Sequence, residues 1–445
     1  MRKPETVREI ALDLIEKIEN NQSFSHLLIN DALKNSDLNP MDRALLTELV
    51  YGTTQRRITL DFYLEPFLRQ TPENWVLNLL RLSVYQLEFL DKVPEHAILH
   101  EAGEIARERG HDGVTKFVNG VLRNVIRKGV PKIEDIRDET TQIAVEASLP
   151  TWLVKRWVAQ FGSEKTREIG LSFLEAPSQS IRVNENKVTV AELQAELSAQ
   201  GIETEQNAYI PEALMMERGS IADTQAYHNG RCTIQDESSM LVAHALQLED
   251  GLRVLDACSA PGGKTTHIAE KMHNTGEIVA LDIHPHKTKL VDKAAKRLDL
   301  TNITTEVTDA RKASELFAPE SFDRVLVDAP CSGFGVLRRK PDIKYSKTEA
   351  DIANLARIQQ AILAEVGALL KENGILIYST CTIDQAENRG VVENFLKSYP
   401  EFQLEQVQVP EKMLPYVQDN YLELVPTDIG SDGFFIAAFR KVTNK

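Results

Sequence analysis

One stretch near the middle of the chain constrains the fold most, because it joins a short apolar run to a helix through two adjacent glycines. The run from Leu252 to Leu255 predicts a buried strand, Pro261-Gly262-Gly263 breaks it, and helix formers resume from Lys264 to Met272. Strand, tight turn and helix form the opening unit of a doubly wound α/β sheet. Glycines lack Cβ atoms, so the turn can adopt positive φ and a ligand can lie against bare backbone.

Two simple interpretations of this turn compete with each other. A phosphate-binding loop needs Gly-x-x-x-x-Gly-Lys-Thr, but Cys258 stands where its first glycine belongs, so the pattern fails by one residue. The other interpretation is a plain strand-to-helix turn without a ligand. The polar residues that follow the later strands favour a third possibility.

Two carboxylates after the next apolar runs indicate S-adenosylmethionine. Asp282 ends the run from Ile278 to Leu281, where a carboxylate can accept hydrogen bonds from both ribose hydroxyls of an adenosine. Asp309 follows a third run, Ile303 to Val307, and is placed for the adenine edge. Ligands of open α/β sheets bind outside the carboxyl ends of the strands, and both residues fall there.

Two further strands each end close to a cysteine. The run after Asp323 ends at Asp328 and is followed by Cys331, and the run from Gly374 to Thr380 is followed by Cys381. We expect these two strands to be neighbours, about 5 Å apart in the sheet. The two thiols would then reach one substrate from the same side.

Composition favours an ordinary cytoplasmic protein of two or three domains. The chain has 445 residues, of which 42% are hydrophobic, and no apolar run approaches a membrane span or a signal-peptide core. Its four cysteines, at positions 232, 258, 331 and 381, lack the spacing of a zinc site or a disulfide framework. We expect a monomer without metal, in which Cys232 and Cys258 are packing residues.

The net charge of −15 argues mildly against nucleic acid, but its local distribution matters more. Residues 1 to about 140 read as amphipathic helices, and the His96–His100 pair reads as helix surface. The window from residue 107 to 132 is basic, which indicates either a solvated helix face or an RNA-backbone patch. Its cations are Arg107, Arg109, Lys116, Arg123, Arg127, Lys128 and Lys132. A second basic run is Arg338-Arg339-Lys340.

Five motifs in order resemble the RNA cytosine-5 methyltransferase family. They are Ala-Pro-Gly-Gly-Lys-Thr-Thr from Ala260, Asp-Ala-Pro-Cys-Ser-Gly from Asp328, Arg-Arg-Lys-Pro-Asp from Arg338, Ser-Thr-Cys-Thr from Ser379 and Asp-Gly-Phe-Phe from Asp432. The helical N-terminal part resembles the antitermination factor NusB. Together they resemble the bacterial members of this family that act on 16S ribosomal RNA, and the resemblance covers essentially the whole chain.

The resemblance implies an α/β fold with a Rossmann-like S-adenosylmethionine-dependent methyltransferase sheet. It implies three domains: an all-helical NusB-like RNA-binding domain at 1–140, a small α+β domain at 145–235 and the methyltransferase domain at 236–445. The cofactor-binding residues would be Cys258, Ser259, Ala260, Pro261, Gly262, Gly263, Lys264, Asp282, Asp309 and Asp328.

The implied chemistry explains why two cysteines are present. Carbon 5 of cytosine is a poor nucleophile until a thiolate adds to carbon 6 and turns the ring into an enamine. Residue chemistry alone does not choose between the thiols. In DNA cytosine-5 methyltransferases the Pro-Cys thiol attacks, which would favour Cys331. The RNA family implies Cys381 as the nucleophile, Cys331 as the residue that helps release product, and Asp328 at the N4 or N3 edge of the base.

The implied substrate is the cytosine of 16S rRNA conventionally numbered 967. Two alternatives stay open: methylation of a cytosine in transfer RNA or elsewhere in rRNA, and a non-catalytic RNA-binding assembly or antitermination factor. Intact cysteines, aspartates and glycine turn argue against the second.

Overall fold

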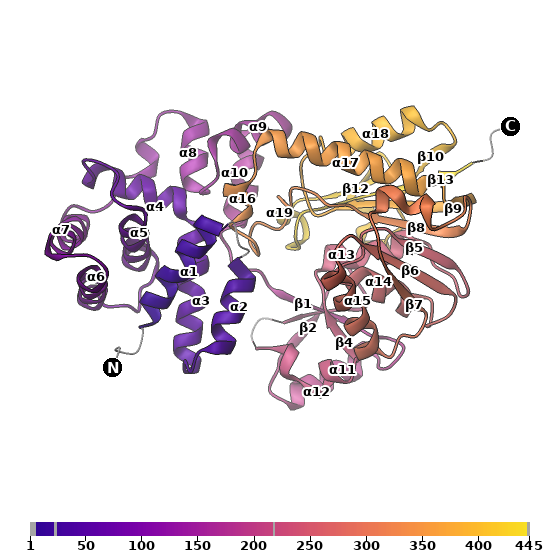
Figure 1. Ribbon diagram of the computed structural model, residues 1–445, viewed down its shortest axis with the longest axis horizontal. Coiled ribbons are helices and arrows are strands. Elements are labelled where there is room, and N and C mark those ends of the chain that lie inside the picture. Colours follow the sequence, from indigo (N-terminus) through magenta and orange to yellow (C-terminus); the bar gives the residue numbers. More distant parts are fainter. Residues whose placement is uncertain (1–5, 22–24, 217–218, 443–445) are drawn as a thin grey trace. The chain divides into compact units, whose positions relative to one another are not determined.

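The computed structural model describes residues 6–21, 25–216 and 219–442, which fall into two compact units (Figure 1). The first unit comprises Met1–Ala176 and the short segment Leu337–Lys347, and the second comprises Pro177–Val336 and Thr348–Lys445. The chain therefore leaves the second unit once, contributes a segment to the first, and returns. The predicted domain boundaries near residues 140 and 235 stay a prediction.

The first unit is built from amphipathic helices around one apolar core. Leu12, Leu46, Leu80 and Leu122 are fully buried in that core. Its helices are α1 (Val7–Asn21), α2 (Ser25–Asn35), α3 (Pro40–Gln55), α4 (Arg57–Leu64), α5 (Asn74–Phe89), α6 (Glu95–Arg109), α7 (Asp112–Lys128), α8 (Glu139–Glu146), α9 (Thr151–Phe161), α10 (Ser163–Ser172) and the short α16 (Ile343–Ser346). The predicted helical N-terminal part is confirmed, and the helices α8, α9, α10 and α16 extend the unit beyond its predicted end near residue 140.

The second unit begins with a small antiparallel sheet in the order β2-β3-β1-β4. Its elements are β1 (Gln179–Val183), α11 (Val190–Ala199), β2 (Thr204–Gln206), β3 (Ala213–Met216), α12 (Gln225–His228) and β4 (Cys232–Ile234). Thr189 and Glu192 form a capping box at the start of α11. Cys232 is buried in β4, in agreement with a packing residue.

A nine-stranded mixed sheet follows, in the order β11-β12-β13-β9-β8-β5-β6-β7, with β10 paired to β13. The strands are β5 (Arg253–Asp256), β6 (Glu277–Asp282), β7 (Ile303–Val307), β8 (Phe322–Asp328), β9 (Leu370–Thr380), β10 (Phe402–Glu405), β11 (Val417–Gln418), β12 (Tyr421–Leu424) and β13 (Phe434–Lys441). Strands β9, β8, β5, β6 and β7 are parallel, whereas β13 runs antiparallel to β9. The predicted Rossmann-like sheet is confirmed.

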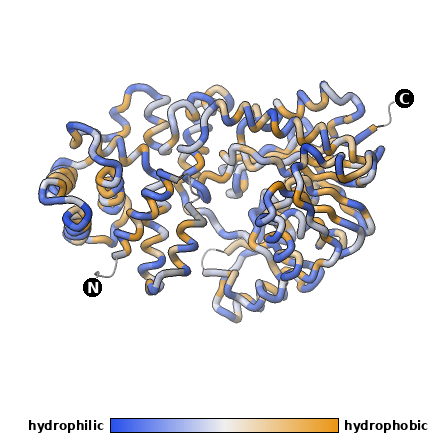
Figure 2. Tube along the Cα trace, viewed as in Figure 1, coloured by the Kyte–Doolittle hydropathy of each residue, from blue (hydrophilic) through white to orange (hydrophobic). Residues whose placement is uncertain are grey.

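Helices cover both faces of this sheet, since alternate strand residues point to opposite sides. Val254 and Ile278 belong to one buried cluster, and their neighbours Leu255 and Val279 belong to another. The covering helices are α13 (Glu237–Ala245), α14 (Gly263–Lys271), α15 (Pro285–Leu298), α17 (Glu349–Gly367) and α18 (Arg389–Ser398), and the short α19 (Pro426–Ile429) precedes β13. Figure 2 shows largely hydrophobic strands, as a sheet buried on both faces requires.

Within residues 6–21, 25–216 and 219–442, we find no helix that combines the length and the apolarity of a membrane span.

Candidate functional site

The carboxyl ends of the parallel strands bring the predicted polar residues to one edge of the sheet. Strand β5 pairs with β8 on one side and with β6 on the other, so the strand order reverses here and leaves a crevice. Asp256 ends β5, Asp282 ends β6 and Asp328 ends β8. In the register, Asp328 lies opposite Ser379 of β9.

The glycine turn is fixed against the neighbouring strand. Gly262 has φ +104°, and a Cβ atom there would lie 3.1 Å from the backbone of Val291, so glycine is needed for both conformation and space. Ser259 donates its N–H and its hydroxyl to the carbonyl of Leu281, at 2.8 and 2.9 Å. The turn therefore stays in place at the end of β6 while the backbone of Gly263 opens α14.

A pocket of about 170 Å³ lies on this turn. Seven predicted cofactor-binding residues line it: Cys258, Ser259, Ala260, Pro261, Gly263, Lys264 and Asp328. Sequence reasoning missed the other lining residues, Ile234, Gln235, Ser239 and Asp256. Five other predicted site residues are not part of this lining: Gly262, Asp282, Asp309, Cys331 and Cys381.

Two buried polar atoms at the pocket lack partners among the described residues. They are Oδ1 of Asp256 and Nε2 of Gln235, one acceptor and one donor, and both side chains are at least nine-tenths buried. Thr265 donates to the other oxygen of Asp256 at 2.7 Å. Burial raises the pKa of Asp256 to about 7, against the opposing hydrogen bond from Thr265. An unpaired acceptor and an unpaired donor in one pocket fit a ligand that carries both kinds of polar group.

Lys264 and Asp328 form an ion pair inside the site. Nζ of Lys264 donates to Oδ2 of Asp328 at 2.8 Å, and Ser379 Oγ donates to Oδ1 at 2.8 Å. Burial alone would lower the pKa of Lys264, but the Asp328 carboxylate outweighs it and the net shift is upward. Lys264 therefore stays charged, and negative charge on Cys381 also raises the pKa of Lys264.

The two predicted thiols are in contact. Cys331 Sγ lies 3.4 Å from Cys381 Sγ, at the ends of the paired strands β8 and β9. The pKa of Cys331 is raised well above its ordinary value by the hydrogen bond with Cys381 and by burial. The pKa of Cys258 is raised too, by burial and by nearby carboxylates, so that thiol stays protonated.

Backbone contacts hold the loop after Cys331 against the loop at Cys381. The N–H of Gly335 donates to the carbonyl of Cys381 at 2.9 Å, and the N–H of Gly433 donates to the carbonyl of Gly335 at 2.9 Å. A Cβ atom on Gly335 would lie 2.0 Å from the Gly433 oxygen. Only glycine allows this approach.

The other two predicted carboxylates lie at the ends of β6 and β7. Asp282 accepts the backbone N–H of His284 at 2.9 Å, which shapes the turn after β6. Asp309 caps the short helical turn after β7 and forms an ion pair with Arg311 at 2.6 Å. The Arg311 side chain lowers the pKa of Asp309.

Two of the seven cations in the basic window of the first unit form ion pairs. Arg109 pairs with Asp13 and Glu16 on α1, and Arg107 pairs with Glu104. Lys116, Arg123, Arg127 and Lys128 remain exposed on α7, next to the exposed ring of Phe117. Arg338, Arg339 and Lys340 are half-buried and belong to the first unit.

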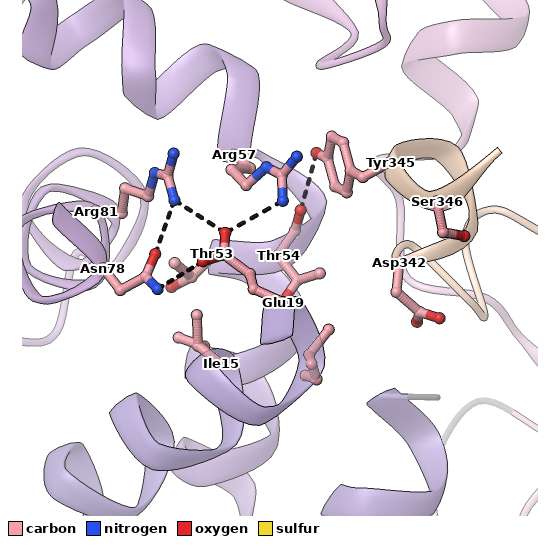
Figure 3. A pocket seen from close by; sticks show the side chains of 11 residues that line it. Ile15, Glu19, Thr53, Thr54, Arg57, Asn78, Arg81, Asp342, Tyr345 and Ser346 are labelled. Atoms are coloured by element: carbon pink, nitrogen blue, oxygen red, sulfur yellow. Dashed lines mark hydrogen bonds and ion pairs between the residues drawn. The ribbon is translucent and has the colours of Figure 1, made fainter. Parts of the chain in front are cut away.

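The first unit has a pocket of its own, which sequence reasoning missed (Figure 3). Glu19 accepts hydrogen bonds from Arg57, Arg81 and Asn78 at 2.7–3.1 Å, so its negative charge is matched by two guanidinium groups. The hydroxyl of Tyr345 donates to the carbonyl of Thr54, and Arg57 stacks on the Tyr345 ring. These contacts attach the segment Leu337–Lys347 to the helices.

Among the residues that the structure describes, no group of three or more His, Cys, Asp or Glu could hold a metal ion.

Three family models match the chain. The model described as 16S rRNA methyltransferase RsmB/F matches residues 243–440, the NusB family model matches 5–127, and a ferredoxin-like domain of RsmF/B-like methyltransferases matches 149–222.

Relatives match over the full length. The probable ribosomal RNA small subunit methyltransferase B of Bacillus subtilis (strain 168) is 49% identical, and the match covers 99% of each chain. Ribosomal RNA small subunit methyltransferase B of Klebsiella pneumoniae is 32% identical over 100% of each chain. Among solved structures, that of PH0851 matches with a TM-score of 0.84 and 26% identity, over 99% of this chain and 100% of the other.

Proposed function

The chain belongs to the RsmB/F family of 16S rRNA methyltransferases, and on that premise we propose that it methylates carbon 5 of a cytosine in 16S rRNA, using S-adenosylmethionine and a covalent cysteine–cytosine intermediate. By resemblance the cytosine is number 967. The contact of Cys331 with Cys381 carries this proposal, because two thiols at the ends of neighbouring strands can reach one base, one to attack carbon 6 and one to assist release.

The pocket on the glycine turn suits the cofactor, which supplies an electrophilic methyl group. The bare backbone at Gly263 accepts close approach, because a Cβ atom there would meet only Gln235, at 3.9 Å. The unpaired donor of Gln235 and the unpaired acceptor of Asp256 match the carboxylate and ammonium of a methionine moiety. In this proposal Asp282 holds the ribose hydroxyls and Asp309 the adenine edge.

The thiols divide the work in this mechanism. Cys381 attacks carbon 6 as a thiolate, and carbon 5 becomes nucleophilic. Cys331, whose raised pKa keeps its proton, donates a hydrogen bond to the Cys381 sulfur before attack. After methyl transfer the carbon 5 proton passes to solvent water, and the electrons of that C–H bond re-form the double bond between carbons 5 and 6. Cys381 leaves carbon 6 as a thiolate, and the Cys331 thiol assists by donating its hydrogen bond to that sulfur again.

Asp328 would fix the base. As a carboxylate held by Lys264 and Ser379, it can accept a hydrogen bond from the N4 amino group or from a protonated N3. Either contact favours the enamine form of the ring, in which carbon 5 is nucleophilic. The base must leave its stack to reach the thiols, which suits an RNA site without stable pairing.

The rest of the chain would bind RNA. We assign an RNA-binding role to the region 1–140, because the NusB family model matches residues 5–127 and α7 carries exposed cations. The small α+β domain would span 145–235 and the methyltransferase domain 236–445. The protein would act on 16S rRNA as a cytoplasmic monomer.

A denaturing gel of protein with radiolabelled RNA tests the mechanism. Cys381→Ala should abolish both methylation and a covalent band, whereas Cys331→Ala should accumulate the band because release is stalled. The reverse pattern would make Cys331 the nucleophile. Full activity in Cys381→Ala would overturn the proposal.

Bisulfite sequencing of RNA from cells that lack the protein tests the substrate. A single lost 5-methylcytosine in 16S rRNA supports the assignment. If the lost 5-methylcytosine lies in transfer RNA or elsewhere in rRNA, that cytosine is the substrate instead. If no 5-methylcytosine is lost, the result favours a non-catalytic assembly factor.

A further inference from the structure

The loops that carry the two thiols are joined underneath by buried polar side chains. Ser332, directly after Cys331, has its hydroxyl 2.8 Å from that of Thr382, directly after Cys381. Ser332 and Thr382 are both at most 1% exposed. Because an unpaired polar group is costly in a buried environment, this contact requires that the two loops keep a fixed position relative to each other.

Glu387 binds the loop on either side of Cys331. Its carboxylate accepts the backbone N–H of Ser332 at 2.8 Å and also the Ser332 hydroxyl. Gln359 of α17 donates to Glu387 and to the carbonyl of Pro330, both at 3.0 Å. The residues before and after Cys331 are therefore tied to one carboxylate, one directly and one through Gln359.

The next residue in the chain, Asn388, does the same for Cys381. Its amide oxygen accepts the hydroxyl of Thr380 at 2.6 Å, and its amide nitrogen donates to the carbonyl of Thr382 at 2.9 Å. Asn388 thus spans Cys381 from the residue before it to the residue after it. Asn388 is 3% exposed.

The burial of Glu387 is costly and needs a reason. The side chain is fully buried, and within the described part of the chain its carboxylate contacts only Ser332 and Gln359, with no ion pair to Lys, Arg or His. Burial raises its pKa, and the bonds from Ser332 and Gln359 oppose that shift. A carboxylate desolvated without a cation destabilises a fold, so stability does not explain it.

We propose that Glu387 and Asn388 are positioning residues, a two-residue clamp in which each side chain brackets one cysteine and together they set the distance between the thiols. Tyr378 anchors the clamp, because its hydroxyl donates to the backbone carbonyl of Glu387. Glu387 and Asn388 bond to the residues that flank the cysteines, so they act through the loops. The proposal rests on the proposed function only in giving the thiols a catalytic use.

A dithiol probe measures the distance between the thiols without any reaction on RNA. Phenylarsine oxide binds two adjacent thiols together, losing its oxygen as water with both thiol protons, and binds a single thiol weakly. The wild-type protein should capture it one to one, and Cys331→Ala should not. Glu387→Ala and Asn388→Ala should weaken capture and lower kcat, each by about a hundredfold, since a shift near 1 Å is enough.

Three further measurements separate positioning from general damage. KM for RNA and affinity for S-adenosylhomocysteine should stay within about twofold in the clamp variants. Glu387→Gln should retain capture, because its amide oxygen still accepts the Ser332 N–H. Glu212→Ala, which removes another carboxylate that is 1% exposed, should lower stability but not capture, since Glu212 contacts His244, His267 and Lys271.

Normal capture in both Glu387→Ala and Asn388→Ala would overturn the proposal. If Glu387→Ala does not fold, Asn388→Ala and Ser332→Ala decide, because each removes one arm of the clamp with a smaller change in buried charge. Failure of the proposed function would give a different result. The wild-type protein would then methylate no cytosine but would still capture phenylarsine oxide, and Glu387→Ala and Asn388→Ala would still weaken that capture.

Discussion

Nζ of Lys264 lies 2.8 Å from Oδ2 of Asp328, so a residue of the glycine turn is bonded directly to the end of β8. Lys264 is 16% and Asp328 26% exposed at the side chain. The pair joins the cofactor pocket to the loop of Cys331. In our proposal it couples the place where the methyl group is held to the place where the base is held.

Asp328→Asn should lower kcat by about a hundredfold, because the amide cannot neutralise Lys264 and one donor of the amide would face it. It should also cost about 1–3 kcal/mol of unfolding free energy, because a partly buried ammonium is left unpaired. Single-turnover kinetics and denaturant unfolding measure the two effects. In the double variant with Lys264→Met, stability should recover but activity should not; an active Asp328→Asn enzyme would contradict the role of Asp328.

Asp282→Ala should weaken binding of S-adenosylhomocysteine by about 1.5–3 kcal/mol, the usual worth of hydrogen bonds to a charged group. Isothermal calorimetry without metal or ATP measures this. Asp292→Ala is the control, since Asp292 is an exposed carboxylate on α15 that bonds Thr305. Equal affinities in the two variants would remove Asp282 from the site.

Asp256 should make stability depend on pH in an unusual direction. Its pKa rises from 3.8 to about 7 on folding, so between these values the folded state holds a proton that the unfolded state has lost. The free energy of unfolding from Asp256 therefore falls as pH rises through this window, by at most about 1.4 kcal/mol per pH unit.

Asp256→Asn should remove that decline, because an amide does not titrate. The test compares wild type and variant by urea unfolding from pH 4 to pH 7. The test uses the difference in unfolding free energy between wild type and variant at each pH. Buried His267, with a pKa lowered to about 3 by burial, makes the stability of both proteins rise with pH over part of this range, and the difference removes that contribution. Parallel curves would show that Asp256 is ionised throughout.

Replacing Arg123, Arg127 and Lys128 together by Gln should weaken RNA binding and reduce its salt slope by about 2, as fewer counterions are released. Filter binding at several salt concentrations measures this. Replacing Lys289, Lys293 and Lys296, exposed on α15, changes net charge equally and serves as the control. If the α7 and α15 substitutions weaken RNA binding equally, α7 is not a specific RNA-binding face. If the α7 substitutions leave the salt slope unchanged, the cations of α7 do not contact the RNA backbone.

The sequence predicted the parallel part of the large sheet well, because each strand there is a short apolar run that ends in a polar residue. Strand β7 begins and ends at the predicted residues, and β6 extends one residue beyond the prediction at each end. The short strands β2, β3, β11 and β12 were not predicted. They form by pairing with other strands, as β12 does with β13, and their four residues or fewer carry no periodic pattern.

At the candidate site, local motifs located the glycine turn and the thiols, but residues brought in by packing were missed. Asp256 could have been found, since it ends a strand as Asp282 and Asp328 do. Gln235 could not, because it precedes α13 and reaches the pocket only through the fold. Nor could local charge counting show that Arg109 is engaged by Asp13 and Glu16.

The contact between Gly335 and Gly433 has a consequence for biosynthesis. The chain is made from its N-terminus, so both cysteines leave the ribosome before Gly433 and β13 do. Until β13 pairs with β9, Gly335 lacks one of the two backbone bonds that hold the loops together. A nascent chain that already carries both thiols therefore lacks part of the backbone contact between their loops until β13 has emerged and paired with β9.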